Sequence, residues 1–339
     1  MTLHTSPTGP GTFSAEGAAS LVSQLKTPAG RSPGQLAWRR FRRDTVGVTS
    51  GAVVLLFFVV GLGAPVISWL YGKDPLTTYG QNHAGLLTDA GYPSKPSGGM
   101  DGEFWFGLEP HNGRDVFMQL VYGIRTSLLL AMAVTLIVTV IGTAIGIMAG
   151  YLGGKTDFVV GRVIDVLLSF PSLLFMLAFI PVVWAMFVSP NEETPAWLRA
   201  GCLIIVLSIF GWTRIARLLR GQVLSLRERE FLDAARVAGA NSRRIIVKEL
   251  LPNLWTPILV LVTLDLPAYV TLEAALSYLG AGMAEPTPDW GRMIHNGADV
   301  YVSDITYLVF PGAALLVFVL AFNLLGDSLR DAVDPKGSH

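Results

Sequence analysis

The stretch Ala149–Thr156, AGYLGGKT, contains the residues of a relaxed nucleotide-binding loop, in which Gly-Lys-Thr follows a small residue after four positions. Such a loop holds phosphates only where a buried strand precedes it and a helix follows it, because backbone amides and the helix N-terminus must converge on the ligand. This stretch instead follows the uncharged apolar run Ser127–Leu152, and its Gly153-Gly154 pair is typical of a tight turn. We therefore predict that this chain does not itself bind ATP.

Two carboxylates, Asp265 and Glu273, interrupt the apolar run Leu254–Gly280. Ionisable groups in such a run are costly to bury, which makes them candidates for functional residues. On one helix, positions eight residues apart lie about 12 Å apart along the axis and about 80° apart around it. We predict that both residues belong to a solute pathway. For Glu273, a hydrogen bond to the neighbouring backbone is the alternative.

Few other side chains in the sequence could perform chemistry. The single cysteine, Cys202, lies in an apolar run, which excludes an intramolecular disulfide and a CxxC metal or redox site. His295 is a lone histidine, with no second histidine or cysteine spaced as a metal ligand. The sequence has neither an HExxH motif nor paired aspartates on separate apolar runs. We therefore predict no catalytic residues, no metal site and no enzymatic activity of the chain itself.

The composition is that of a membrane protein. Of the 339 residues, 51% are hydrophobic and 15% are charged, and the mean hydropathy is +0.51. These values are too apolar for an ordinary soluble protein of this length. The formal net charge is zero, so no basic field indicates nucleic acid as a partner. Lipid is the expected neighbour.

The apolar runs predict an all-α, polytopic membrane protein with six transmembrane helices. A helix needs about 20 apolar residues to cross a bilayer, because every backbone amide must find its partner within the helix. Six runs meet this length: Val46–Trp69, Ser127–Leu152, Val166–Val188, Ala200–Arg220, Leu254–Gly280 and Ile305–Gly326. The first run follows a polar tail, so we expect a retained anchor and no cleaved signal peptide.

The basic residues predict the orientation in the membrane. Lys and Arg are enriched in cytoplasmic segments close to membrane spans. If the N-terminus is cytoplasmic, most of the 25 Lys and Arg residues fall on the cytoplasmic side, with the largest group between Arg214 and Lys248. The chain is therefore expected to cross the cytoplasmic membrane several times with both termini inside the cell.

These assignments divide the chain into five parts. They are a cytoplasmic tail (1–45), the first transmembrane helix (46–70), an external loop (71–123), a five-helix core (124–327) and a second cytoplasmic tail (328–339). Within the external loop, Val116–Tyr122 is expected to form a short interfacial helix before the second span. Within the core, the charged segment 221–253 favours helix and is expected to be an ordered cytoplasmic insertion.

The insertion is expected to contain two helices. Leu232, Ala235 and Ala238 recur at helical spacing, which predicts a helix from about Arg229 that Gly239 ends. Asn241-Ser242 can cap a second helix, which Pro252 closes where the fifth span begins. A small-residue face permits close approach by a partner protein, whereas the arginines also suit a helix lying on anionic lipid. The residues themselves leave both interpretations open.

Glycine and proline predict how the spans pack. Gly142, Gly146 and Gly150 are spaced by four on the second span, which favours a seam for the close approach of another helix. Pro171 and Pro181 are expected to kink the third span.

The insertion resembles the EAA loop of the membrane subunits of bacterial ATP-binding-cassette (ABC) importers. The shared pattern is Asp233-Ala234-Ala235, then Gly239, then Glu249-Leu-Leu251-Pro252. In that family the loop forms coupling helices that sit in a cleft of the cytoplasmic ATPase, so the resemblance implies an ATPase-coupling role for Asp233, Ala234, Ala235, Gly239, Leu251 and Pro252. Asp233 replaces the usual Glu. Glu249 stands where the peptide-permease branch usually has His, and we assign it no role.

Four further segments resemble the C-type permease subunit of dipeptide and oligopeptide transporters. They are Gly113–Ser127, Glu273–Gly280, Pro286–Gly291 and Phe322–Pro335. The resemblance implies a B-type sister permease, two cytoplasmic ATPase domains that hold ATP and magnesium, and an external substrate-binding protein. For Arg114 and Asp115, in the first segment, we predict an external gate or binding-protein contact, with local salt bridging as the alternative.

The resemblance implies a non-catalytic subunit that forms half of a peptide pathway across a bacterial cytoplasmic membrane. The same branch also includes permeases for nickel and other small solutes, so these substrates remain alternatives. An ATP-independent carrier or channel is a different class, for which we would expect inverted repeats and broken polar helices at matching positions of both halves. The sequence shows neither feature.

Overall fold

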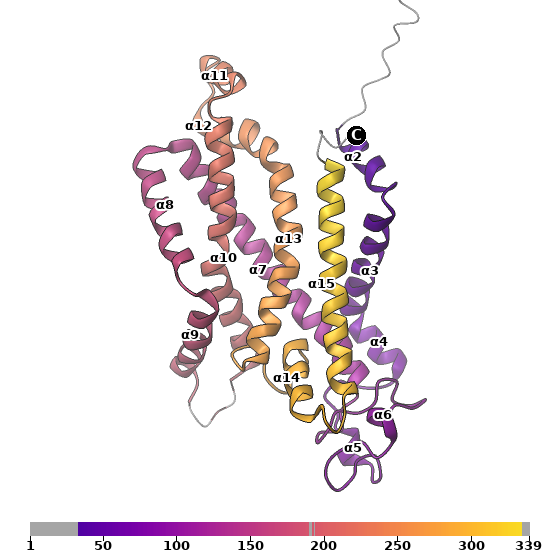
Figure 1. Cartoon of the computed structure of the whole chain (residues 1–339). Coiled ribbons are helices and arrows are strands. Elements are labelled where there is room, and N and C mark those ends of the chain that lie inside the picture. The colour runs from indigo at the N-terminus through magenta and orange to yellow at the C-terminus, as the bar shows by residue number, and fades with distance from the viewer. Residues whose placement is uncertain (1–32, 190–191, 193, 334–339) are drawn as a thin grey trace, which may run out of the picture.

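A computed structural model describes residues 33–189, 192 and 194–333. The predicted tail residues 1–32 and 334–339, with their basic residues Lys26, Arg31 and Lys336, lie outside the described residues. Long helices lie side by side in a bundle, with short helices and loops at its ends (Figure 1). The helical fold class predicted from the apolar runs is confirmed.

The elements follow the chain in a simple order. The elements up to Leu152 are α2 (Pro33–Phe41), α3 (Thr45–Leu62), α4 (Ala64–Tyr71), α5 (Tyr79–Asn82), α6 (Pro96–Gly99) and α7 (Val116–Leu152). The elements after Leu152 are α8 (Gly154–Ser169), α9 (Ser172–Phe187), α10 (Ala196–Leu226), α11 (Glu230–Val237), α12 (Ser242–Arg244), the π-helix η1 (Ile245–Leu250), α13 (Leu251–Tyr278), α14 (Trp290–Val300) and α15 (Thr306–Val333).

Five helical segments of the described chain are long and apolar enough to cross a membrane, and the count becomes six if α8 and α9 form one broken span. The first predicted span is divided at Gly63 into α3 and α4. α3 begins after Asp44, whose side chain accepts a hydrogen bond from the Val46 amide at 3.0 Å. This cap fixes the start of the first apolar helix, α3.

The second span differs from the prediction. A separate interfacial helix was expected at Val116–Tyr122, but α7 runs without interruption through Val116–Leu152. Asp115 caps its first turn by accepting a hydrogen bond from the Met118 amide at 2.7 Å. A helix continues as long as its backbone hydrogen bonds form, and the buried packing of the first turns of α7 stabilises them.

The third span is broken at the proline that was predicted to kink it. α8 and α9 meet at an angle of 85°. At the junction Phe170 is extended, and Pro171 has a non-helical ψ of 84°. Pro171 lacks a backbone N–H and disfavours helix at the residue before it, which explains the break. Pro181, by contrast, lies within α9, and the helix continues past it.

The predicted glycine seam joins α7 to α10. A Cβ atom on Gly142 would lie 2.8 Å from the Trp212 carbonyl oxygen, and one on Gly146 would lie 2.7 Å from that of Ala216. A Cβ atom on Gly150 would meet Val223 Cβ at 2.8 Å. Glycine therefore permits backbone contact along three successive turns, which close van der Waals packing between membrane helices requires.

The two ends of the bundle have different characters. α11, α2 and the C-terminal end of α15 lie at one end, whereas α5, α6 and α14 lie at the other (Figure 1). At the second end, Trp290 of α14 is fully buried and packs edge-on against Phe57 and Phe318. The short helix α14 thus closes the core between α3 and α15.

We expect Gly146→Ala to destabilise the bundle. The added methyl group has backbone atoms of α10 as neighbours, so relief requires the whole helix to move, and overpacking of this kind costs about 1–3 kcal/mol. The check is thermal unfolding of the purified chain in detergent. Gly221→Ala on α10 is the control, because a Cβ atom there has no neighbour within 4 Å. Equal melting temperatures of the two variants would contradict the seam.

Candidate functional site

The helix α11 is built as an independent helical segment at one end of the bundle. Glu230 and Asp233 lie in its first turn and Arg236 in its last, which suits the helix dipole. Arg236 also donates to Asp233 at 2.8 Å. Gly239 follows with φ of +81°, a conformation that glycine adopts without strain. The predicted end of this helix at Gly239 therefore has a backbone cause.

The two faces of α11 differ in what they contact. Leu232 is fully buried against the bundle. On the outer face, Ala234 and Ala238 are exposed, and Val237 beside them is 89% exposed. Phe231 is also exposed. A small, apolar and protruding surface of this kind is typical of a site that another protein covers.

After a short loop, α11 is followed by one continuous helical run into the bundle, which corrects the prediction at Pro252. Asn241 caps α12 as expected, by accepting a hydrogen bond from the Arg244 amide at 2.9 Å. Pro252 was expected to close this helix, but the helical run continues from Ser242 to Tyr278. The turn before the proline widens into η1, where the Leu251 amide donates to the Ile246 carbonyl. A π-turn removes the ring clash that would otherwise stop the helix.

Asp265 on α13 lines a cavity at the α8–α9 bend. The residue is 2% exposed, and its Oδ1 accepts a hydrogen bond from Arg214 Nη1 of α10 at 2.9 Å. The cavity has a volume of about 210 Å³, and its walls include Ser172, Tyr269 and Leu272. Asp265 is therefore a buried anion that a neighbouring cation stabilises beside an open space.

Glu273 occupies a different environment from Asp265. It is fully buried on the same helix, where its Oε1 accepts a hydrogen bond from the Ser277 hydroxyl at 3.1 Å. Among the described residues, its other oxygen, Oε2, is buried and has no hydrogen-bond partner. The structure therefore places Asp265 at a cavity and Glu273 inside the packed core, and the two carboxylates do not share a site.

Arg114 and Asp115 are both engaged within the chain. Arg114 is 9% exposed and forms ion pairs with Glu109 at 3.8 Å and with Glu285 at 3.4 Å. Asp115 is fully buried, and it caps α7 while accepting a hydrogen bond from the Tyr71 hydroxyl at 3.0 Å. Arg114 thus forms the salt bridges that the sequence left as the alternative, whereas the contacts of Asp115 are hydrogen bonds. The external gate or binding-protein contact stays a prediction.

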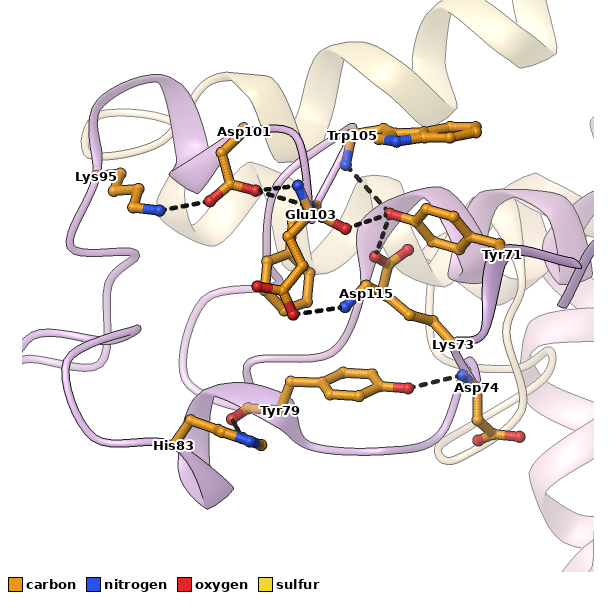
Figure 2. A network of polar contacts seen from close by, with 11 residues as sticks. Tyr71, Lys73, Asp74, Tyr79, His83, Lys95, Asp101, Glu103, Trp105 and Asp115 are labelled. Carbon is orange, nitrogen blue, oxygen red and sulfur yellow. Dashed lines mark hydrogen bonds and ion pairs between the residues drawn. The ribbon is translucent and has the colours of Figure 1, made fainter. Parts of the chain in front are cut away.

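The segment between α4 and α7 is an ordered polar network (Figure 2). The Trp105 amide donates to the Tyr71 hydroxyl at 3.2 Å, which ties α4 to the loop before α7. Lys73 pairs with Glu103 at 3.1 Å and lies 3.8 Å from the ring centroid of Phe104. No sequence motif indicated this network, because its order depends on contacts across long loops.

One carboxylate of this network has a strongly shifted pKa. The ammonium group of Lys95 and the backbone N–H of Phe104 lower the pKa of Asp101 from 3.8 to about 2. A depressed folded-state pKa stabilises the fold above pH 3.8, and this contribution disappears as the pH falls through about 2. The network therefore retains the ion pair at physiological pH.

Sequence reasoning missed a set of ion pairs along α10. Arg217 donates to Asp165 of α8 at 2.6 Å, and Arg220 Nη2 donates to Asp157 of α8 at 2.8 Å. Together with Arg214, three arginines at a spacing of three residues therefore each pair with a carboxylate on another helix. The sequence feature that could have predicted these pairs is the presence of Asp157, Asp165 and Asp265 on other apolar helices, as possible partners for the three arginines.

The stretch AGYLGGKT forms a corner between two helices. Its first residues end α7, Gly153 and Gly154 have positive φ values of 66° and 55°, and α8 begins at Gly154. The geometry is the tight turn that the glycine pair predicted.

Two protein-family models match the sequence. Residues 142–339 match the binding-protein-dependent transport system inner membrane component. Residues 32–84 match the N-terminal transmembrane domain of oligopeptide transport permease C. The first match includes the seam, the insertion and Asp265, and the second includes α3 and α4.

Curated relatives resemble the chain over most of their length. The dipeptide transport system permease protein of Alkalihalophilus pseudofirmus is 32% identical, over 90% of this chain and 90% of that protein. The oligopeptide transport system permease protein of Escherichia coli strain K12 is 35% identical, over 91% and 92%. A glutathione transport system permease protein of Escherichia coli is 32% identical, over 95% and 96%.

A solved structure shares the fold. A chain of the MetNI methionine ABC transporter, in an inward-facing conformation, aligns with a TM-score of 0.51 and 21% identity. The alignment covers 64% of this chain and 97% of that chain. At this identity the likeness concerns the arrangement of helices alone.

We expect Tyr71→Phe to loosen the polar network between α4 and α7. Loss of the hydroxyl leaves the buried Asp115 carboxylate with one donor fewer, and an unsatisfied buried partner costs about 1–3 kcal/mol in the free energy of unfolding. Thermal unfolding measures the effect. Tyr301→Phe is the control, because Tyr301 is 56% exposed. The same melting temperature for both variants would show that the network does not hold α4 to α7.

Proposed function

The chain belongs to the family of binding-protein-dependent transport system inner membrane components, and from that membership we propose how it takes part in solute uptake. It is a membrane permease subunit of a bacterial ABC importer. In our proposal it forms half of the solute pathway, and a sister permease of the B type forms the other half. Asp265 and its cavity belong to the wall of that pathway.

The observation that carries the coupling proposal is the exposed face of α11, a helix that a short loop joins to the helical run Ser242–Tyr278. Among the helices, α11 lies farthest out at its end of the bundle (Figure 1). An amphipathic helix resting on lipid lies at the level of the headgroups, with its apolar face toward the acyl chains. The apolar side chain of Val237 instead points outward at 89% exposure. This placement favours a partner protein over a lipid surface.

We propose that this face binds one of the two cytoplasmic ATPase domains of the complex, which hold the ATP and magnesium. The chain itself then contributes no bond chemistry. α11, the C-terminal end of α15 and α2 lie at the same end of the bundle, and we assign that end to the cytoplasm on the basis of its many basic residues. Both termini are cytoplasmic in this orientation. An external binding protein then delivers the solute at the end that holds α5, α6 and α14.

The proposed stroke passes from α11 through a short loop into one long helical run. When the ATPase domains close, they move α11, and the helical run Ser242–Tyr278 carries the displacement to Asp265. Transport requires that the ATPase binds α11 differently in its two states, because only differential contacts shift an equilibrium. The break between α8 and α9 lies on another wall of the same cavity, where a rigid-body rotation can open or close it.

We propose peptides as the solute class. The names of the curated relatives specify dipeptides, oligopeptides and glutathione, which are all short peptides. The carboxylate of Asp265 in the cavity wall supports a solute with a cationic group. Nickel or another small solute remains the alternative within the family, and uptake assays with purified solutes decide between them.

We expect Val237→Asp to uncouple the chain from its motor. The substitution places a charge on the apolar face of α11, and an unpaired charge is costly to bury in an interface. Co-purification with the ATPase domains measures the effect, and we expect at least about a tenfold loss, corresponding to about 1.4 kcal/mol or more.

The matched control for this test is Val302→Asp. Val302 is 82% exposed and precedes α15 at the opposite end of the bundle. The ATPase domains are expected to remain bound to this variant. Equal retention of the ATPase by the two variants would remove α11 as the docking site.

We expect Asp265→Asn to reduce uptake without affecting assembly. The substitution removes the buried charge at the cavity but keeps the size of the side chain, so a cationic solute loses an attraction while the fold persists. Uptake by reconstituted complexes is measured beside ATPase co-purification. Asp165→Asn is the control, because that carboxylate is 59% exposed and pairs with Arg217. Unchanged uptake by Asp265→Asn would exclude this residue from the pathway.

A further inference from the structure

We propose that the cavity at the α8–α9 bend binds the two charged ends of a zwitterionic solute. The N-terminus of α9 and Arg214 hold its carboxylate, and Asp265 holds its ammonium group. This inference rests on the proposed function, because it assigns a recognition role to the pathway wall. Beyond that function, the inference states what the site recognises: a small molecule that carries both a free carboxylate and a free ammonium group.

The first element is a helix that begins beside the cavity with an open N-terminus. Pro171 is the N-cap of α9 and provides no side-chain hydrogen bond. The first intrahelical bond joins the Phe175 amide to the Pro171 carbonyl at 3.1 Å. The amides of Ser172, Leu173 and Leu174 therefore have no acceptor within the helix. Ser172 lines the cavity, so this partial positive charge of about +0.5 is available to an anion there.

The second element is the guanidinium group of Arg214. One nitrogen donates to Asp265, while 57% of the side chain is exposed. A guanidinium carries five N–H donors, so donors remain available after the contact with Asp265. Arg214 also lines the cavity, on the wall formed by α10. Arginine and a helix N-terminus together favour a carboxylate, which can accept hydrogen bonds from both.

The third element is the second oxygen of Asp265. Among the described residues, Oδ2 of this carboxylate is buried and has no hydrogen-bond partner. A buried carboxylate with an unsatisfied oxygen is costly, so a ligand that brings N–H donors to the Asp265 carboxylate at the cavity wall gains affinity. An ammonium group carries three donors and the complementary charge. In the proposal, the Asp265 carboxylate at the cavity wall is therefore the partner of the solute cation.

The combination selects a zwitterion over a simple ion. A free anion meets the carboxylate of Asp265, and a free cation meets Arg214 and the helix N-terminus, so each suffers one repulsive contact. A zwitterion satisfies both signs and leaves the net charge of the site unchanged, which matters where water is scarce. The cavity volume of about 210 Å³ suits a small solute, and its apolar lining, including Met176 and Phe210, tolerates varied side chains.

The test compares three peptides on the purified complex of this chain with its sister permease and ATPase domains, without the binding protein. Dialanine has both charged termini, dialanine amide lacks the carboxylate, and N-acetyl-dialanine lacks the ammonium group. Ligand-induced thermal shifts give the apparent dissociation constants. We expect dialanine to bind the wild type at least about tenfold more tightly than either blocked peptide, since each blocked peptide loses a charge-assisted contact.

Variants of the chain assign each terminus to its partner. Arg214→Gln is expected to abolish the discrimination against dialanine amide, and Asp265→Asn the discrimination against N-acetyl-dialanine. Arg214→Lys is expected to restore part of the first preference. Arg217→Gln is the matched control, because it removes a neighbouring ion pair of the same helix that lines a different cavity. This control is expected to keep the full wild-type selectivity.

Three outcomes overturn the proposal. Equal shifts with all three peptides, no shift with any of them, or the same selectivity in Arg214→Gln as in the wild type would each exclude a zwitterion site. If the complex assembles and transports solute in those cases, the proposed function stands without this site. If the wild-type chain fails to co-purify with a permease and ATPase partner, the proposed function fails and the site fails with it.

Discussion

The structure depends on one constraint, which is that backbone polar groups inside a bilayer must be satisfied by the chain itself. Long helices meet this constraint, and α7 shows it most simply by running for 37 residues without a break. At two prolines the chain departs from a regular α-helix, and each has a local solution. At Pro252 a π-turn keeps the helix continuous, whereas at Pro171 the chain breaks and bends by 85°. The second solution leaves open amides beside a cavity, so the constraint itself creates a place for a polar ligand.

Charged groups on the helices are stabilised by partners on neighbouring helices. Arg214, Arg217 and Arg220 of α10 each pair with a carboxylate of another helix. An isolated buried charge would be unfavourable by several kcal/mol. The ion pairs therefore allow α10 to carry three arginines and still pack against the glycines of α7. Of the three carboxylates in these pairs, Asp265 alone combines deep burial with an oxygen that lacks a partner. That asymmetry separates its site from the other two pairs, whose carboxylates are more exposed.

The arrangement of the helices gives the subunit its mechanical properties. α11 presents a small apolar face at one end, and the helical run from Ser242 to Tyr278 joins that end to Asp265. α10, which is fixed to α7 through glycine, forms another wall of the cavity. In the proposed stroke, motion of α13 relative to the α7–α10 pair changes the cavity and leaves the glycine seam between α7 and α10 intact.

The sequence by itself determined the features that depend on neighbouring residues: the apolar helices, the end of α11 at Gly239, the glycine seam and the break at Pro171. Spacing and local backbone preference decide these features, so they can be predicted along the chain. The tertiary structure decided which groups meet. It paired Arg214 with Asp265 across 51 positions and placed Glu273 in the packed core. It also continued α7 through Val116–Tyr122 and the fifth span through Pro252. These outcomes depend on packing between distant segments, whose energies no local pattern contains.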